Sequence, residues 1–262
     1  MALAGNRLTS TLLHVVLPTS SLLAIAIMFW VGFSGQSIPV AQTDSDAGGV
    51  EGLTYATQLG DGATLQVQAD SALFLQNQIR ASGVSGVITY PDGRLHQFNS
   101  ERANAGWDLS FAGFENGVLV EKPQDGSNLT VWFESGSAGS NGLIGRKVQA
   151  TRSGADDSTQ RLVADQLFLR LDGSSANISG NARFYWQGDD ANDSFSVSAE
   201  GFELIKDRFL LQSDGPAEFQ FIQGAGRTGQ FRVIDWRGKS TGRIEFSGGV
   251  EVTYLEPPPN PS

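Results

Sequence analysis

The sequence predicts an all-β, antiparallel fold for the chain beyond residue 43, and three observations lead to it. Apolar and polar residues alternate in many short runs, which places one side of each strand on a core and the other in water. The chain contains 32 glycines, well above the background of ~7 %, and they mark turns and bulges. Helical periodicity is weak. The clearest runs are 65–69, 195–199, 209–211, 219–221, 231–233, 244–246 and 250–254.

The N-terminal part differs, because residues Leu8 to Thr43 contain no Asp, Glu, Lys or Arg. Within this stretch, Leu12 to Phe33 is mostly apolar and long enough to supply the ~20 residues that a helix needs to cross a bilayer. Pro18 is expected to kink this helix near its start. Trp30 lies where an aromatic belt would meet the outer interface. We therefore predict a single N-terminal transmembrane helix.

The flanking charges orient this helix. Arg7 and the free amine precede it, and acidic residues follow it from Asp44 onward, so the N-terminus is predicted in the cytoplasm and the rest outside. A cleaved signal peptide is the alternative, because the uninterrupted apolar core Leu22 to Phe33 is within the ~7–15 residues of such a peptide. Pro39-Val40-Ala41 is a poor match to a cleavage site, which favours the anchor.

The predicted organisation has four parts. Residues 1–35 form the cytoplasmic tip and the anchor, 36–52 a flexible linker that includes DSDAGGVEG, and 53–255 one β domain. Residues 256–262 (EPPPNPS) form a proline-rich tail that cannot continue a ladder of backbone hydrogen bonds.

The composition excludes several functions. There is no cysteine, so disulfides, thiolate metal sites and cysteine nucleophiles are impossible. A net charge of −10 and a pI near 4.6 argue against nucleic acid, which requires clustered Lys and Arg. No H-E-x-x-H zinc motif occurs. We expect a protein that is not an enzyme and has no cofactor and no metal.

Three local features have weaker functional interpretations. His96 is the only histidine outside the predicted anchor and follows an Asp92-Gly93 turn, so a solvated side chain is expected. The acidic loop 188–193 lacks the glycine and glutamate of an EF-hand, which leaves a hairpin turn. Phe184-Tyr185-Trp186 is interpreted as a core strand, with a sugar-stacking platform or a lipid contact as alternatives.

A degenerate repeat supports the all-β prediction. The segments 65–70, 161–165 and 195–200 each end in an Ala-acid pair, and each is followed by another apolar run. We interpret the pattern as a strand, a small residue at a tight corner, an acidic turn residue and a return strand. Stacked β-rolls are built from such repeated units. Residues 90–106 and 121–145, rich in Gly, Ser, Asn and Asp, are predicted to be either long hairpins or loops.

From Asp193 to Leu255 the chain resembles the LptA/LptC/OstA family of lipopolysaccharide-transport proteins. The residues that carry the resemblance are SFSVSAEGFEL (194–204), LLQSDGPAEF (210–219) and GRIEFSGGVEV (242–252), the last similar to the family's final strand pair. At the start of the domain, GLTY (52–55) and residues 62–75 are similar to the family's opening strands. The family has no catalytic signature.

The resemblance implies an OstA-like β-jellyroll, and the uncleaved anchor implies its LptC-like branch. Such a protein is a single-pass inner-membrane protein with its C-terminal domain in the periplasm. It receives lipopolysaccharide from the inner-membrane transporter subunits and passes it through an apolar groove to the next, LptA-like, jellyroll. This chain departs from the family in a longer periplasmic part, with the excess around residues 90–145.

Alternating apolar positions are the candidates for an interior that binds acyl chains, and the last strand is the candidate partner edge. A membrane-anchored β-sandwich that binds carbohydrate or assembles envelope structure is the alternative function. The candidate lipid-binding residues are Phe184, Trp186, Phe195, Val197, Phe209, Leu211, Phe219, Phe221, Phe231, Val233, Ile244 and Phe246. The candidate edge residues are Val250, Val252, Thr253 and Tyr254.

Overall fold

A computed structural model confirms the all-β, antiparallel prediction for the residues that it describes, which form one sheet of fourteen strands. The described residues are 48–58, 62–106, 111–122, 127–139, 142–154, 158–170, 175–188, 194–205, 210–222, 224–234 and 243–254. The strands are β1 (Gly48–Gln58), β2 (Thr64–Phe74), β3 (Gln78–Thr89), β4 (Leu95–Gly106), β5 (Phe111–Lys122), β6 (Asn128–Gly139), β7 (Gly142–Ser153), β8 (Thr159–Leu169), β9 (Ser175–Gln187), β10 (Ser194–Ile205), β11 (Leu210–Ser213), β12 (Ala217–Phe221), β13 (Gly224–Ile234) and β14 (Arg243–Tyr254).

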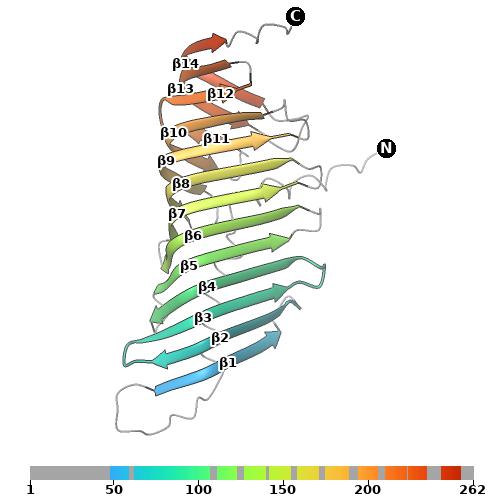
Figure 1. The fold of residues 1–262 in the computed structure, drawn as a ribbon, viewed down its shortest axis with the longest axis vertical. Coiled ribbons are helices and arrows are strands. Elements are labelled where there is room, and N and C mark those ends of the chain that lie inside the picture. Colours follow the sequence, from blue (N-terminus) through green and yellow to red (C-terminus); the bar gives the residue numbers. More distant parts are fainter. Residues whose placement is uncertain are drawn as a thin grey trace, which may run out of the picture.

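The sheet is a long antiparallel meander. From β1 to β10 each strand pairs with the next along the chain, so the strands follow one another in sequence order along the length of the molecule (Figure 1). At the C-terminal end β11 and β12 both pair with β10, and β13 pairs with β11, β12 and β14. The described residues of 90–106 and 121–145, for which hairpins and loops were both open, belong to paired strands of this meander or to the connections between them.

The hydrogen-bonded register is interrupted near the middle of most strands. Paired positions are missing at Gly83 and Glu101 between β3 and β4, and at Lys147 and Asp165 between β7 and β8. The register shifts beside Glu200 between β9 and β10. Because these interruptions lie side by side from strand to strand, they form one line along which the whole sheet can bend.

Left-handed backbone conformations explain why the bend occurs at this line. Gly83, Asn116, Lys147 and Gly180 have positive φ there, with values of 58°, 50°, 52° and 73°. Such conformations are strained for residues with a Cβ and are most tolerated by glycine and asparagine. The side chain of Asp70 covers Gly83 so closely that a Cβ at Gly83 would overlap it.

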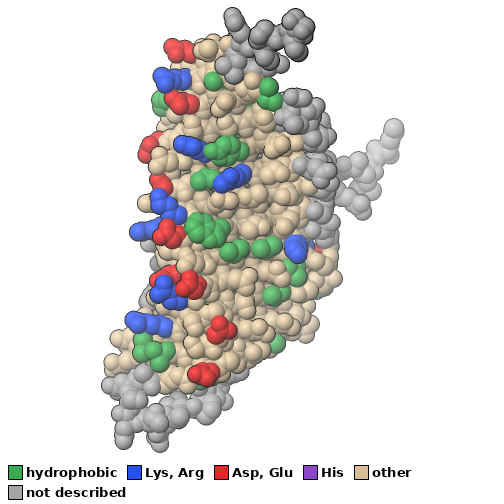
Figure 2. All heavy atoms as spheres, in the orientation of Figure 1, with side chains coloured by type: hydrophobic (Ala, Val, Ile, Leu, Met, Phe, Trp, Pro, Cys, Tyr) green, Lys and Arg blue, Asp and Glu red, His purple; other side chains and the backbone are tan. Residues whose placement is uncertain are grey.

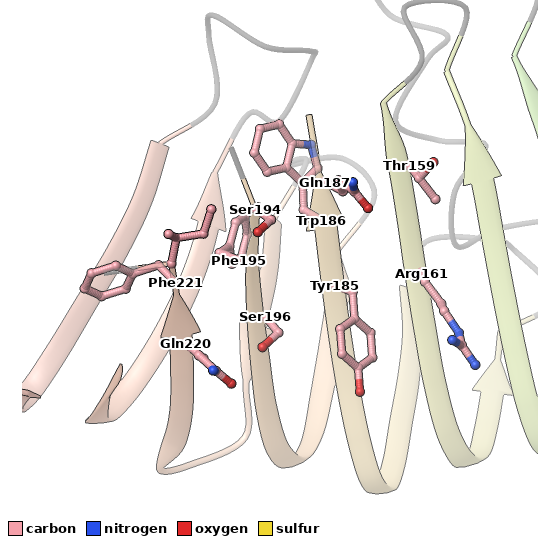
Figure 3. A pocket seen from close by; sticks show the side chains of 11 residues that line it. Thr159, Arg161, Tyr185, Trp186, Gln187, Ser194, Phe195, Ser196, Gln220 and Phe221 are labelled. Carbon is pink, nitrogen blue, oxygen red and sulfur yellow. The ribbon is translucent and has the colours of Figure 1, made fainter. Parts of the chain in front are cut away.

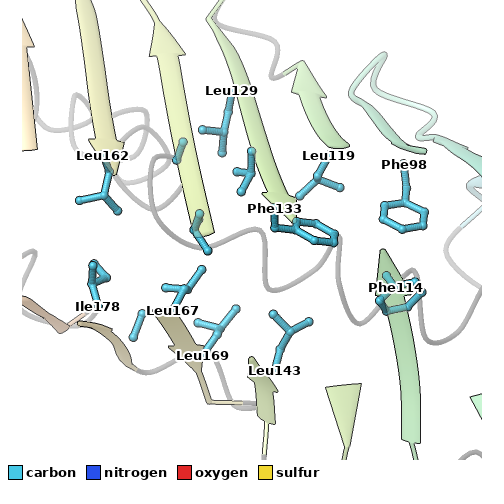
Figure 4. Close-up of a cluster of buried hydrophobic side chains, with 14 of the residues drawn as sticks. Phe98, Phe114, Leu119, Leu129, Phe133, Leu143, Leu162, Leu167, Leu169 and Ile178 are labelled. Atoms are coloured by element: carbon cyan, nitrogen blue, oxygen red, sulfur yellow. The ribbon is translucent and has the colours of Figure 1, made fainter. Parts of the chain in front are cut away.

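The bend brings the two halves of the sheet face to face. The ring centroids of Phe98 on β4 and Phe114 on β5 are 5.2 Å apart, although Phe98 is opposite Leu119 in the register. In a flat sheet, Phe114 would lie roughly 17 Å along the strand from Leu119 at ~3.4 Å per residue. The strands are therefore folded over, and the core lies between the two halves (Figure 4).

We call the two halves half-sheet 1 and half-sheet 2. Half-sheet 1 contains the strand segments that carry Phe98, Leu119, Leu162 and Phe184. Half-sheet 2 contains the segments that carry Phe114, Leu167, Phe202 and Phe231. Side chains of both half-sheets point toward one another in the buried cluster of Figure 4.

Three sequence-based predictions differ from the structure. Strand β1 begins at Gly48, inside the predicted linker, because this segment completes the ladder with β2. Asp70, Asp165 and Glu200 do lie at corners, but the apolar run after each one continues the same strand after the bend and is not a return strand. Residues 243–252 are one bent strand of β14 and not a strand pair, since Gly248 and Gly249 take up the bend with positive φ.

Several predicted features lie outside the described residues. These are the anchor Leu12 to Phe33, the acidic residues 189–193, Phe209 and the tail 256–262. Among the residues that are described, no helix has the length and apolar character needed to cross a bilayer.

Candidate functional site: the interior of the folded sheet

The central row of the interior face of half-sheet 1 has no polar side chain along its length. One residue from each strand from β2 to β14, except β11, forms this continuous cross-strand row, in which each residue is the register partner of the next. Its members are Val67, Gly86, Phe98, Leu119, Val131, Ala150, Leu162, Phe184, Val197, Phe219, Gly226 and Val252. This arrangement follows from period-two alternation, which directs every second side chain to the same face.

The interior face of half-sheet 2 is equally apolar. A second row runs through it along the strand ends that lie farthest from the bend. Its buried members are Ile79, Ala105, Ala112, Leu143, Leu169, Ala176, Leu204, Leu211 and Val233, and it ends at Ile244 on β14. The two half-sheets therefore enclose a slab of aliphatic and aromatic side chains, with stacked Phe98 and Phe133 rings 6.3 Å apart near its centre.

A polar segment interrupts the outermost interior row of half-sheet 1. That row contains, in register order, His96 on β4, Glu121 on β5, Leu129 on β6, Arg152 on β7 and Gln160 on β8. His96 and Glu121 are 1 % and 3 % exposed, and His96 Nε2 lies 3.2 Å from Glu121 Oε1. Polar side chains thus occur in the outermost interior row of half-sheet 1 only from β4 to β8.

The prediction that His96 is solvated is wrong. His96 is two residues before buried Phe98 on the same strand, so strand alternation points both side chains inward. The ring of Tyr90 packs edge-on against the imidazole with centroids 5.0 Å apart, and the guanidinium of Arg94 lies 4.5 Å above the Tyr90 ring. The Asp92-Gly93 turn itself is exposed.

The structure brings the described candidate lipid-binding residues to the interior face. Phe184, Val197 and Phe219 are buried there, and the partly buried Trp186, Phe195 and Phe221 pack against the same core. Leu211, Phe231 and Val233 are buried in half-sheet 2. In the stretch 184–186, Tyr185 points outward between its two inward neighbours. The core interpretation therefore fits Phe184 and Trp186 and not Tyr185.

Ile244 and Phe246 belong to the same interior but lie at its end. Phe246 on β14 contacts Phe219 across the interior, with centroids 4.3 Å apart, and Phe231 at 5.8 Å. Both residues remain more than a third exposed, as do Val250 and Val252 on the other half of β14. The apolar interior is therefore open to solvent along β14, which a closed core would not be.

Strand β14 is an edge in the described sheet, since its only pairing there is with β13. The carbonyl oxygen of Thr253 faces β13, because a Cβ at Gly224 would lie 2.7 Å from it. Backbone groups of alternate residues in an antiparallel strand point to opposite sides. The backbone N–H and C=O groups of Val250, Val252 and Tyr254 therefore face away from β13. Those of Thr253 face β13 and belong to the β13–β14 ladder.

Two features of the site were not predicted from the sequence: the polar segment of the interior and the exposed Tyr185. Alternation from Phe98 and Leu119 identifies His96 and Glu121 as inward-facing, so this signal was present in the sequence. No group of three or more His, Asp or Glu side chains in the described strands is arranged to hold a metal ion. No protein-family model matches the chain, and no curated protein matches it either.

Proposed function

We propose that this chain is an LptC-like, non-enzymatic lipid-transfer protein of the lipopolysaccharide export machinery. In this proposal the bent sheet is an OstA-like β-jellyroll held at the inner membrane by residues 12–33, with its C-terminal domain in the periplasm. It receives lipopolysaccharide from the transporter subunits and passes it to an LptA-like jellyroll. The resemblance of residues 193–255 to that family supports the identity of the lipid and of the partners.

One structural observation supports the proposal most directly. The interior rows stay apolar up to β14, where Phe246 and Val252 face the interior and are 37 % and 41 % exposed. A stable monomer gains ~25 cal/mol for each Å² of apolar surface that it buries. Leaving these side chains open therefore costs stability, which an acyl chain or a second apolar interior would recover.

In this proposal, lipid leaves the domain at the edge strand β14. An added strand that pairs with Val250, Val252 and Tyr254 would extend the sheet by β-augmentation. It would also continue the apolar rows into the partner, because cross-strand neighbours share a face. The interior of one domain would then be continuous with that of the next, which is the route that a lipid tail needs.

Site-specific photo-crosslinking tests this proposal. A photoreactive amino acid replaces Phe246 or Phe195, which face the interior, and Glu245 or Glu203 serve as matched controls on the same strands with outward side chains. We expect lipopolysaccharide to be labelled from the two inward positions and not from the two controls. Equal labelling from both faces, in variants whose circular dichroism shows an intact sheet, would refute an interior path.

A further inference from the structure

From β2 to β10, the outer face of half-sheet 1 is nearly free of charge in an otherwise acidic chain. Two of its outward rows run from Gln66 and Gln68 on β2 to Ser196 and Ser198 on β10. Between these strands the two rows carry Gln, Asn, Ser, Thr, Val and aromatic side chains, and their only charged members are Arg161 and Arg183. None of the described residues in this part of the two rows is a carboxylate, although the whole chain has 28. A third outward row carries Lys122, and beyond β10 the row of Gln68 continues to the ion pair of Glu218 and Arg227.

The charges of the sheet are concentrated elsewhere. Asp70, Glu101, Glu134, Lys147 and Asp165 lie along the bend. Figure 2 shows this segregation on the face that it draws, where charged side chains gather along the left margin and most of the remaining surface is uncharged. A bare sheet face usually relies on charges for solubility and against edge-to-edge association, so this distribution requires a reason.

Two aromatic side chains stand exposed on this uncharged face. Trp132 on β6 is 41 % exposed and Tyr185 on β9 is 37 % exposed. Three strand spacings of ~4.8 Å and one step of two residues along the strand separate them, which is roughly 16 Å. Between them, Arg161 Nη2 donates a 3.0 Å hydrogen bond to Gln149 Oε1. That bond fixes the Gln149 amide with its NH₂ group available to a ligand.

A groove lies beside Tyr185 across β8, β9, β10 and β12, with a volume of about 430 Å³. Figure 3 shows Tyr185, Arg161, Ser196 and Gln220 projecting from neighbouring strands. Thr159 and Gln187 also line it. Apart from Arg161 and the Trp186 indole, whose N–H only donates, every polar side chain in this lining is a neutral hydroxyl or amide that can both donate and accept hydrogen bonds.

We propose that this outer face binds a neutral oligosaccharide, with Trp132 and Tyr185 as stacking surfaces and the amides of Gln149, Gln187 and Gln220 as hydrogen-bonding groups. Sugar hydroxyls need paired donors and acceptors, which amides and hydroxyls supply without charge. The apolar face of a sugar ring packs on an exposed aromatic ring. The separation of the two rings requires several sugar units and not one. These side chains project from the face of the sheet opposite the interior, although the groove also reaches the inward-facing Trp186, Phe195 and Phe221. The proposal does not require lipid binding.

Native electrophoresis of the full-length protein in gels that contain polysaccharide tests the proposal. The net charge of −10 gives the protein its own mobility. A polyoxyethylene detergent is used because it has no sugar headgroup that would compete. The gels contain dextran, β-1,3-glucan or galactomannan as neutral probes, or polygalacturonate as an anionic probe. We expect at least one neutral polysaccharide to retard the protein, with little dependence on salt.

The variants Trp132→Ala and Tyr185→Ala are expected to weaken this retardation about tenfold each, as for the loss of one aromatic contact of about 1.4 kcal/mol. Ile144→Ala is the matched control, since Ile144 is a 42 % exposed apolar side chain on the outer face of half-sheet 2. It is expected to leave retardation unchanged. The proposal is overturned if no neutral polysaccharide retards the protein, if only polygalacturonate does, or if the two aromatic variants behave like the wild type or like the control.

Discussion

Lys147 Nζ donates a 2.6 Å hydrogen bond to Asp165 Oδ1 across the bend between β7 and β8. Asn181 Nδ2 on β9 donates a second bond of 2.8 Å to the other carboxylate oxygen. The bond from Lys147, followed by the bond from Asn181, lowers the pKa of Asp165, and the bond to Asp165 raises the pKa of Lys147. One acidic side chain thus links three consecutive strands at the bend.

This linkage predicts a pH dependence of stability. A carboxyl group whose pKa is lowered in the folded state stabilises the fold above its unfolded pKa of ~3.9, and this contribution disappears as the pH falls through the folded pKa. Asp165→Asn is therefore expected to be less stable than the wild type at neutral pH, with a difference that shrinks in acid. Urea unfolding at several pH values measures it. A difference that is constant down to pH ~2 would contradict this assignment.

The raised pKa of Lys147 predicts a pH dependence of stability in the opposite direction. Its contribution is complete below the unfolded pKa of ~10.4 and is lost as the pH rises through the folded pKa. Lys147→Met is expected to raise the pKa of Asp165 toward its usual value, because the main cause of the lowering is gone. Proton titration of the Asp165 carboxyl by NMR measures this shift, and an unchanged titration curve would show that Lys147 is not the cause.

The pair His96 and Glu121 is expected to be costly to break. His96→Leu removes a partner 3.2 Å from the buried carboxyl group of Glu121, and a buried polar group that loses its partner typically costs ~1–3 kcal/mol. The double variant His96→Leu with Glu121→Leu is expected to recover most of this, because no buried polar group is left without a partner. Chemical denaturation of the three proteins gives the coupling. Additive losses in the double variant would show that the two side chains do not depend on each other.

The closed and open parts of the interior are expected to respond differently to truncation. Phe231 is fully buried and Phe246 is exposed at the edge. Phe231→Ala is expected to lower the free energy of unfolding by ~3–5 kcal/mol, as for other buried phenylalanines. Phe246→Ala is expected to cost less than half of that. Equal losses, measured by urea unfolding, would mean that the interior is closed along β14 in solution.

The edge of β14 is expected to pair through Val252 and not through Thr253. Val252→Pro removes an N–H that faces away from β13, and it is expected to weaken association with a partner jellyroll while the domain stays folded. Val252→Thr is the matched control, because it keeps the N–H and the branched shape. Thr253→Pro interrupts the β13–β14 ladder and is expected to destabilise the domain. A folded Val252→Pro variant that binds its partner as tightly as the control does would exclude this edge as the docking surface.

The predicted anchor has a direct biochemical test. Residues 12–33 are expected to hold the full-length protein in the membrane, because they supply the ~20 apolar residues of a transmembrane helix. Carbonate extraction of membranes is expected to leave the intact chain in the pellet. Release of a shorter form that begins near Gln42 would instead identify the segment as a cleaved signal peptide.

Strand content and side-chain facing could be predicted from the sequence, because both depend on local alternation. Runs such as 195–199 and 250–254 gave the correct inward residues Phe195, Val197 and Val252. The acids Asp70, Asp165 and Glu200 gave the positions of three corners. The repeat could not reveal that the chain continues in the same strand after each corner, since a bend and a hairpin turn use the same residue types.

The sequence by itself thus determined an all-β chain with alternating faces and the absence of thiol chemistry. Only the tertiary structure decided that one sheet bends along a single line, so that Phe98 and Phe114 meet across the interior. It also decided that His96 is buried, that Tyr185 is outside, and that the interior opens along β14. These properties depend on where the strands bend and on where the ladder ends. The packing of the two half-sheets against each other sets them, and no local alternation pattern encodes that packing.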